Sequence, residues 1–174
     1  MDINFYFVQS DYIHFLKEYE ILHRGFTCVP NTEYASREKF LFGAVFESNG
    51  TRYFVPVSSQ IKNRDNNIVI TAGKNNTKKL GSLRFAYMIP VPNSCLIPLR
   101  INEIPEENRR QRIRGELAFC RRNIHKIKMQ AQKTFTTVIN SKNIKLKNNS
   151  CDFSLLEAAY EEYCHIHNIE SGEK

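Results

Sequence analysis

Residues 42–62, FGAVFESNGTRYFVPVSSQIK, contain the strongest structural signal in the chain. Asn49-Gly50 separates two apolar segments rich in β-branched and aromatic residues, and Asn-Gly is the preferred pair for a two-residue hairpin turn because both residues tolerate positive φ. The sequence therefore predicts a hairpin in which residues 42–47 pair with residues 52–57. The second strand then runs out into two hydroxyls and, shortly after them, a lysine.

Further strands are predicted from short runs of β-branched and aromatic residues. They lie at 4–8, 68–70, 83–91 and 96–101. Residues 21–39 show no period and contain turn-forming glycine, proline and asparagine, so a long loop is expected there. Strands fill the first hundred residues and helices the rest. This order is typical of an α+β domain in which helices cover an antiparallel sheet.

Helices are predicted where apolar residues recur every three or four positions. A short helix should follow Ser10, whose hydroxyl is a suitable N-cap. Residues 113–138 form one long apolar face, with a break expected at Asn123. A last helix should begin at Ser154, because Ser154 and Glu157 have the spacing of a capping box.

The length and charge of the chain indicate a single domain with a polyanionic partner. A chain of 174 residues is long enough for one core, so one domain over 1–174 is expected, with a frayed tail from about residue 168. The net charge is +7, and residues 100–147 carry thirteen Lys or Arg against four Glu. The excess of positive charge is therefore local, and it favours nucleic acid as the partner.

The sequence predicts a cytoplasmic protein without metal or cofactor. Its five cysteines include no C-x-x-C pair, no apolar run could span a bilayer, and no export segment is recognisable. Cys164, His165 and His167 resemble metal ligands only faintly, since alternate residues of a helix point apart. The sequence also contains no phosphate-binding glycine loop and no zinc-protease motif.

The end of the second hairpin strand is the main candidate site. Ser58 and Ser59 with Lys62 could contact a phosphate ester and stabilise developing negative charge. The same residues also fit an ordinary strand end with a solvated lysine. Tyr34 and Lys39 lie near the end of the predicted loop, where they are either functional or simply exposed.

A series of basic residues on the predicted long helices is the second candidate. The series consists of Arg109, Arg110, Arg112, Arg114, Arg121, Arg122, Lys126 and Lys128. It is interpreted as a phosphate-contacting surface, with an ordinary solvated helix face as the alternative. From composition alone, a non-catalytic RNA-binding module and an interaction domain for acidic proteins both remain possible.

Five stretches taken in order resemble the toxins of type III toxin-antitoxin systems, the ToxN/AbiQ family of endoribonucleases. They are residues 10–13, 34–43, 53–59, 80–90 and 151–157. The resemblance implies a strongly curved antiparallel sheet with helices around it, similar to the Kid/MazF toxins. It also implies metal-independent cleavage of single-stranded, adenine-rich RNA to 2′,3′-cyclic phosphate ends.

The resemblance further implies an RNA antitoxin and a set of catalytic residues. Family members are inhibited by a repeated pseudoknot RNA that they process, and they form ring-shaped complexes with it. Several of these systems abort phage infection. The toxin without its RNA can be a monomer. By position, the family's catalytic hydroxyl falls on Ser59, with Ser58 replacing a threonine. The resemblance also places Lys39, Tyr34 and Tyr12 at the active site, and Lys62 near the lysine that follows the serine motif.

Overall fold

The predicted hairpin forms the centre of the sheet in this computed structural model, which describes residues 3–32 and 39–170. Strand β2 (Leu41–Ser48) pairs antiparallel with β3 (Thr51–Ser58), from Leu41 opposite Pro56 to Ser48 opposite Thr51. At the turn, Asn49 has φ 49° and Gly50 has φ 81°, as a two-residue hairpin turn requires. The hairpin prediction is confirmed.

Five more strands complete an antiparallel sheet. They are β1 (Asn4–Val8), β4 (Asn67–Ala72), β5 (Lys78–Arg84), β6 (Ile89–Pro90) and β7 (Leu96–Pro98). The strand order is β4-β5-β3-β2-β1-β7, and β6 also pairs with β3. The strands expected at 4–8, 68–70 and 96–101 are therefore present as β1, β4 and β7.

The strand expected at 83–91 is instead interrupted. A 3₁₀ turn, η2 (Phe85–Tyr87), separates β5 from β6. Both strands pair with β3, β5 at its end and β6 at its beginning. The chain therefore stops pairing with β3 at η2 and pairs with it again at β6. A continuous run of apolar residues in the sequence does not reveal this interruption. The other 3₁₀ turns are η1 (Lys74–Asn76), η3 (Asn93–Cys95) and η4 (Ile101–Glu103).

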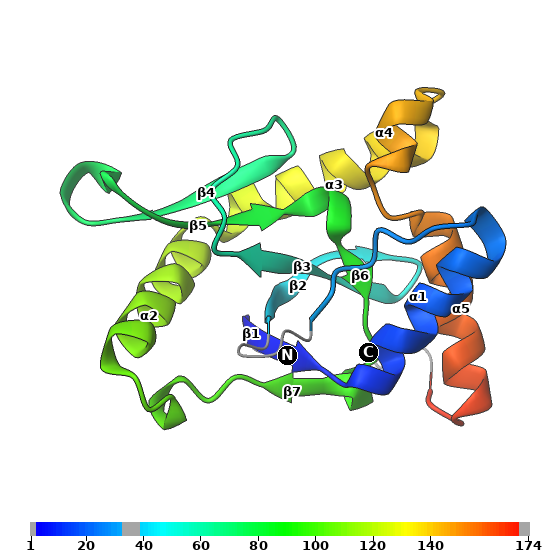
Figure 1. Ribbon diagram of the computed structural model, residues 1–174, viewed down its shortest axis with the longest axis horizontal. Helices are drawn as coiled ribbons and strands as arrows, with labels where there is room; N and C mark the ends of the chain where they lie inside the picture. The colour runs from blue at the N-terminus through cyan, green and yellow to red at the C-terminus, as the bar shows by residue number, and fades with distance from the viewer. Residues whose placement is uncertain (1–2, 33–38, 171–174) are drawn as a thin grey trace.

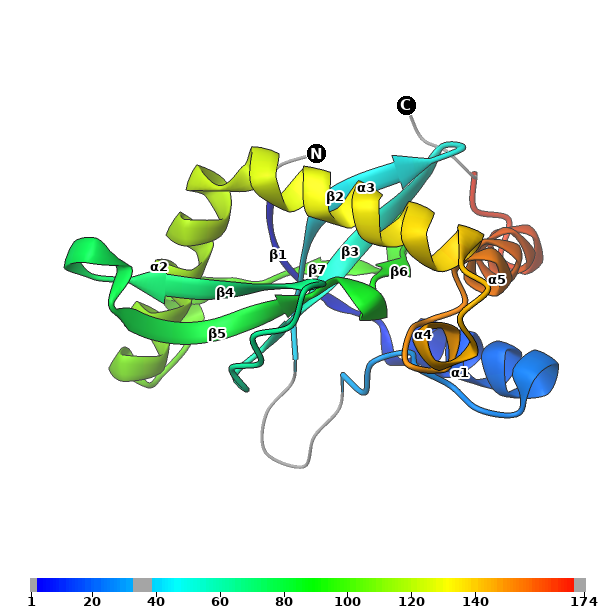
Figure 2. The same cartoon turned by 90° about the horizontal axis from the view of Figure 1, so that it is seen from above.

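The helices surround this sheet. They are α1 (Ser10–Arg24), α2 (Glu107–Arg122), α3 (Ile124–Asn140), α4 (Ile144–Asn148) and α5 (Phe153–Ile166). Figures 1 and 2 show α1 and α5 side by side at one end of the molecule and α2 at the other, with α3 crossing the sheet between them. The break at Asn123 is where predicted, and the expected combination of an antiparallel sheet with covering helices is confirmed.

Two helices differ from prediction at their boundaries. Ser10 is the first residue of α1 and not its N-cap, which is Gln9 without a side-chain cap hydrogen bond. Helix α1 continues to Arg24 and ends at Gly25, whose φ of 83° is the left-handed value favoured by glycine. Helix α5 begins one residue earlier than expected, because the side chain of Asp152 accepts the amide of Leu155 at 3.1 Å. The capping box at Ser154 is therefore wrong.

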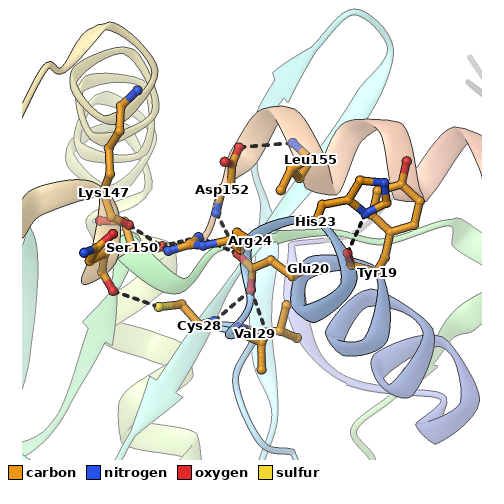
Figure 3. Close-up of polar contacts among 12 residues, drawn as sticks. Tyr19, Glu20, His23, Arg24, Cys28, Val29, Lys147, Ser150, Asp152 and Leu155 are labelled. Atoms are coloured by element: carbon orange, nitrogen blue, oxygen red, sulfur yellow. Dashed lines mark hydrogen bonds and ion pairs between the residues drawn. The ribbon is translucent and has the colours of Figure 1, made fainter. Parts of the chain in front are cut away.

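The last turns of α1 are held by a buried carboxylate, Glu20, which is 0% exposed. One oxygen accepts a hydrogen bond from Arg24 at 2.7 Å and from the amide of Asp152 at 2.8 Å. The other accepts from the Thr27 hydroxyl at 2.6 Å and the Cys28 amide at 2.7 Å. The full set of partners stabilises the buried charge and ties α1 to the start of α5 (Figure 3).

Arg24 extends this network to α4. Its guanidinium donates to the carbonyl of Ser150 at 3.0 Å and to that of Lys147 at 3.0 Å (Figure 3). These carbonyls lie at and just after the end of α4, where helical carbonyls lack partners within the helix. The position of α4 is thus fixed from the α1 side.

Aromatic packing holds α3 and α5 against β3. The ring of Phe135 on α3 stacks on Phe153 of α5, with centroids 5.2 Å apart, and both rings contact Tyr53. The Tyr53 hydroxyl donates to the Glu157 carboxylate at 3.1 Å.

Within residues 3–32 and 39–170, no helix is long and apolar enough to cross a membrane.

Candidate active site

The polar end of β3 is held in a fixed turn beside β5. Ser58 is 8% exposed and lies opposite Ser82 of β5, whereas Ser59 is exposed. The Ser58 hydroxyl accepts the amide of Gln60 at 3.2 Å, and the Ser82 hydroxyl donates to the Gln60 carbonyl at 2.8 Å. These two bonds orient the turn so that Ser59 faces outward.

Lys39 lies across from the two serines. The amide of Val57 donates to the carbonyl of Phe40 at 3.2 Å, which extends the β2–β3 ladder beyond the first residue of β2. Continuing that register by one residue places the backbone of Lys39 opposite Ser58. Lys39 is half-buried, and its amide donates to the carbonyl of Thr32 at 2.9 Å. The backbones of two predicted site residues that are distant in sequence are therefore neighbours here.

Two grooves flank the turn after β3. The first, of about 570 Å³ and called here the Ser59 groove, is lined by Ser59, Ile61, Ala72, Lys78, Lys79, Leu80, Asn108, Gln111, Arg112 and Gly115. The second, of about 650 Å³ and called here the Lys62 groove, is lined by Lys62, Arg64, Asn66, Asn67, Arg84, Ala86, Tyr87, Asn143, Lys145, Leu146, Asn149 and Ser150. No Asp or Glu occurs among these lining residues, so both grooves favour an anionic ligand.

Gly81 allows β5 to approach β3 closely at this point. A Cβ atom placed on Gly81 would lie 2.6 Å from the carbonyl oxygen of Ser58 and 3.4 Å from a carboxylate oxygen of Glu116. Real Cβ atoms do not approach a backbone oxygen so closely. Only glycine therefore fits beside Ser58 without displacing the strand end.

Arg112 connects helix α2 to the same edge of the sheet. Its guanidinium donates to the Leu80 carbonyl at 2.6 Å and to the Glu116 carboxylate at 3.1 Å. Glu116 is 2% exposed, and burial raises the pKa of its carboxyl, although Arg112 opposes that change. Arg112 is half-exposed and also lines the Ser59 groove, where its positive charge is available to a phosphate.

Arg84 is a site residue that sequence reasoning missed. Its guanidinium donates to the side-chain oxygen of Gln60 at 3.2 Å, and its Nε atom is buried without a hydrogen-bond partner among the described residues. Ser82 and Arg84 occupy alternate positions of β5, and alternate residues of a strand point to the same face. That spacing of polar residues in an apolar strand was the available signal.

Tyr12 does not lie beside the serines in this structure, although the family resemblance places it in the catalytic set. Its ring is 0% exposed, packs against Tyr163 at 4.8 Å, and donates its hydroxyl to the carbonyl of Pro90 at 2.7 Å. Burial raises the pKa of Tyr12 well above its usual value. Pro90 pairs with Tyr53, near the start of β3. With a rise of about 3.3 Å per residue, Tyr53 lies about 16 Å from Ser58 along the strand.

The other predicted residues are placed as follows. Lys62 is exposed and lines the Lys62 groove, whereas Ser59 lines the other groove. Tyr34 lies outside the described residues, as do 171–174 of the expected tail. Within the described ranges, no three His, Cys, Asp or Glu residues gather closely enough to hold a metal ion.

The basic series on α2 and α3 divides into two groups. Arg110, Arg112, Arg114 and Arg121 hydrogen bond to the chain itself, through Ile104, Leu80, Asn102 and Ile3 respectively. Arg109 is half-buried, whereas Arg122, Lys126 and Lys128 are exposed near the α2–α3 junction. Because α2 and α3 point in different directions (Figure 1), the series is not one continuous helix face.

Comparison with known proteins relates this arrangement to a family. The family model described as Toxin ToxN, type III toxin-antitoxin system, matches residues 4–161. Endoribonuclease AbiQ of Lactococcus lactis subsp. lactis is 27% identical over 169 residues, covering 91% of this chain and 87% of AbiQ. Endoribonuclease ToxN of Bacillus thuringiensis subsp. kurstaki is 26% identical over 167 residues, covering 91% of this chain and 83% of that protein.

Solved structures give the same relationship. The structure of AbiQ, a lactococcal anti-phage endoribonuclease of the type III toxin-antitoxin system, matches with a TM-score of 0.81 at 25% identity, covering 95% of this chain and 99% of that chain. A structure from a bacterial antiviral system regulated by a processed non-coding RNA matches with a TM-score of 0.75 at 26% identity, covering 92% and 98% of the two chains.

Fold and comparisons together define the class of this protein as an endoribonuclease toxin. The chain belongs to the ToxN toxin family of type III toxin-antitoxin systems, because the family model spans most of its length. The resemblance inferred from five short stretches is thereby confirmed. The alternatives of a non-catalytic binding module and of a protein interaction domain lose their support.

Proposed function

We propose that this chain cleaves single-stranded, adenine-rich RNA without a metal ion, leaving 2′,3′-cyclic phosphate ends. The observation that carries the proposal is the end of β3, where Ser59 lines a cationic groove and the backbone of Lys39 lies opposite Ser58. An RNA strand entering the Ser59 groove would bring its backbone to Ser59. The preference for adenine and the form of the product ends rest on the family resemblance.

The residues at this site match the needs of an internal transesterification. The 2′-oxygen of one ribose attacks the neighbouring phosphorus, a new O–P bond forms, and the bond to the 5′-oxygen breaks. The proton of the 2′-hydroxyl goes to a base, and the 5′-oxygen receives a proton from an acid. Ser59, Lys39 and Lys62 supply a hydroxyl and two amines for alignment, proton transfer and stabilisation of the phosphorane charge.

Arg112 adds a fixed positive charge to this set. Its bonds to Leu80 and Glu116 hold the guanidinium in the Ser59 groove, where it can contact a phosphate oxygen. A charge held in advance costs no reorganisation when the transition state forms. Tyr12 has no part in this proposal because its ring lies in the core.

The test is to express the Ser59→Ala variant and to incubate the purified protein with RNA in the presence of EDTA. Growth arrest and RNA cleavage should both be lost, while Ser154→Ala, an exposed serine on α5, should behave like wild type. A Ser59→Ala protein that arrests growth and cuts RNA at the normal rate contradicts the assignment. Binding without cyclic-phosphate products would show an RNA-binding module instead.

We further propose that the regulating partner is a repeated pseudoknot RNA, processed by this protein and assembled with it into a ring in which the toxin is inactive. The exposed cations at the α2–α3 junction, Arg122, Lys126 and Lys128, support a contact with such an RNA. A role in aborting phage infection is part of the same proposal. AbiQ is described as an anti-phage endoribonuclease, which motivates it.

Charge reversal tests the antitoxin contact. Arg122→Glu should weaken binding of the antitoxin RNA and reduce the slope of affinity against salt concentration, because each phosphate contact releases counterions. Arg100→Glu makes the same charge change at another exposed arginine and serves as the control. Equal affinities of the two variants across a salt series would contradict a specific role for Arg122.

A further inference from the structure

The Lys62 groove combines the side chains that recognise an unpaired nucleobase. It contains an aromatic ring, Tyr87, and several asparagine amides between cationic rims that include Arg64 and Lys145. Aromatic rings stack on bases, whereas an amide offers a donor and an acceptor to a base edge. Simple phosphate binding requires only the cations, so the amides and the ring need another explanation.

Three of the four amides in this groove already support the protein itself. Asn67 donates to the carbonyl of Lys62 at 3.0 Å, and Asn149 donates to that of Lys145 at 2.8 Å. Asn143 caps α4 by accepting the amide of Leu146 at 3.2 Å. The amide of Asn66 makes no hydrogen bond within residues 3–32 and 39–170, so its donor and its acceptor are both available.

The side chain of Tyr87 is also available to a ligand in this groove. It lies in η2, directly after β5, and is half-buried with its ring against the core. Its hydroxyl has no partner in the described part of the chain, although it lines the polar groove. A ring supported from behind loses little conformational entropy when a base stacks on it.

Arg84 joins this groove to the candidate active site. It lines the groove and also donates to Gln60, the residue that follows Ser59. One side-chain hydrogen bond therefore links a residue of the groove to the residue next to Ser59. This link is the reason to place in the groove a nucleotide next to the cleaved linkage.

We propose that the Lys62 groove holds the base of a nucleotide adjacent to the cleaved linkage, with Tyr87 stacking on the base and Asn66 hydrogen bonding to its edge. Asn66 and Tyr87 are thus specificity-determining residues. This inference rests on the proposed function, because it requires RNA cleavage beside Ser59.

The test maps cleavage sites in a random-sequence RNA pool under single-turnover conditions. Asn66→Asp replaces the amide donor by an acceptor and should change the preference for the base at one position near the cut by about tenfold, while total cleavage persists. Asn63→Asp makes the same change at an exposed position of the same loop outside the groove, and should keep the wild-type preference. Identical base distributions for wild type and Asn66→Asp would overturn the role of Asn66.

A second pair of variants tests the ring. Tyr87→Leu should lower kcat/KM by about tenfold, as expected for loss of one base–aromatic stack, and Tyr87→Phe should stay near wild type. Circular dichroism identifies any variant that fails to fold. A folded Tyr87→Leu protein that cleaves like wild type would overturn the stacking role. If wild-type protein itself cut no RNA, the proposed function would fall, and the inference would fall with it.

Discussion

Gly81→Ala is expected to damage both the fold and the candidate active site. The new Cβ would lie 2.6 Å from the Ser58 carbonyl oxygen, and ordinary contact begins at 3.4 Å, so one strand must move by about 0.8 Å. Overpacking of this kind costs about 1–3 kcal/mol. For a chain of this size, that loss lowers Tm by about 2–12 °C.

Activity should fall more than stability. The displaced oxygen belongs to Ser58, and the adjoining turn orients Ser59, so the hydroxyl would leave its position by a similar distance. A shift approaching 1 Å at a reacting group can cost on the order of 100-fold in rate. We expect single-turnover RNA cleavage to fall by about 10- to 100-fold.

The assay compares Gly81→Ala with Gly115→Ala by thermal unfolding and by RNA cleavage. At Gly115 the new Cβ would meet only the end of the Leu80 side chain, at 3.2 Å, and alanine is a better helix former by about 1 kcal/mol. Gly115→Ala should therefore keep its stability or gain some. Wild-type Tm together with wild-type cleavage in Gly81→Ala would show that β3 and β5 accommodate a side chain at this position without moving Ser59.

Three further predictions concern buried polar groups. Tyr12→Phe leaves the Pro90 carbonyl without its 2.7 Å partner, so unfolding in urea should show a loss of about 1–2 kcal/mol with RNA cleavage retained; a large loss of cleavage would restore Tyr12 to the active site. Glu20→Ala removes the carboxylate that pairs with Arg24 and with two amides, so the free energy of unfolding should fall by about 3–5 kcal/mol, whereas an unchanged urea midpoint would show that the network is dispensable. Burial raises the folded-state pKa of Glu116 above its ordinary 4.5, so the folded protein binds more protons than the unfolded one just above that pH, and stability should fall as pH rises through this range. In Glu116→Gln, the free energy of unfolding should not fall with pH in this way. An equal dependence on pH in wild type and variant would contradict the prediction.

The sequence predicts the fold correctly where a structural element is determined by neighbouring residues. The Asn49-Gly50 pair defines its own turn, and the strands beside it follow from that turn. The prediction fails where a distant contact overrides a local pattern. Glu20 looks like the polar end of an amphipathic helix, yet its carboxylate is buried because partners from other segments surround it.

The candidate site was predicted in part for a similar reason. Ser58, Ser59 and Lys62 are neighbours in sequence, so their proximity needed no knowledge of the fold. Arg84 and Arg112 reach the same place only because β5 pairs with β3 and α2 packs against β5. No local spacing encodes those pairings, so the sequence predicted Arg112 as a phosphate contact on a basic helix but not its place in the groove beside Ser59.

The Arg24 guanidinium has a consequence for how this protein could evolve. It holds α4 in place by donating hydrogen bonds to the carbonyls of Lys147 and Ser150. Residues of α4 form one wall of the Lys62 groove. The position of one wall of a groove that we expect to discriminate among nucleotides thus depends on a residue of α1. Substitutions at Arg24, which does not line that groove, could therefore change which nucleotide the protein prefers.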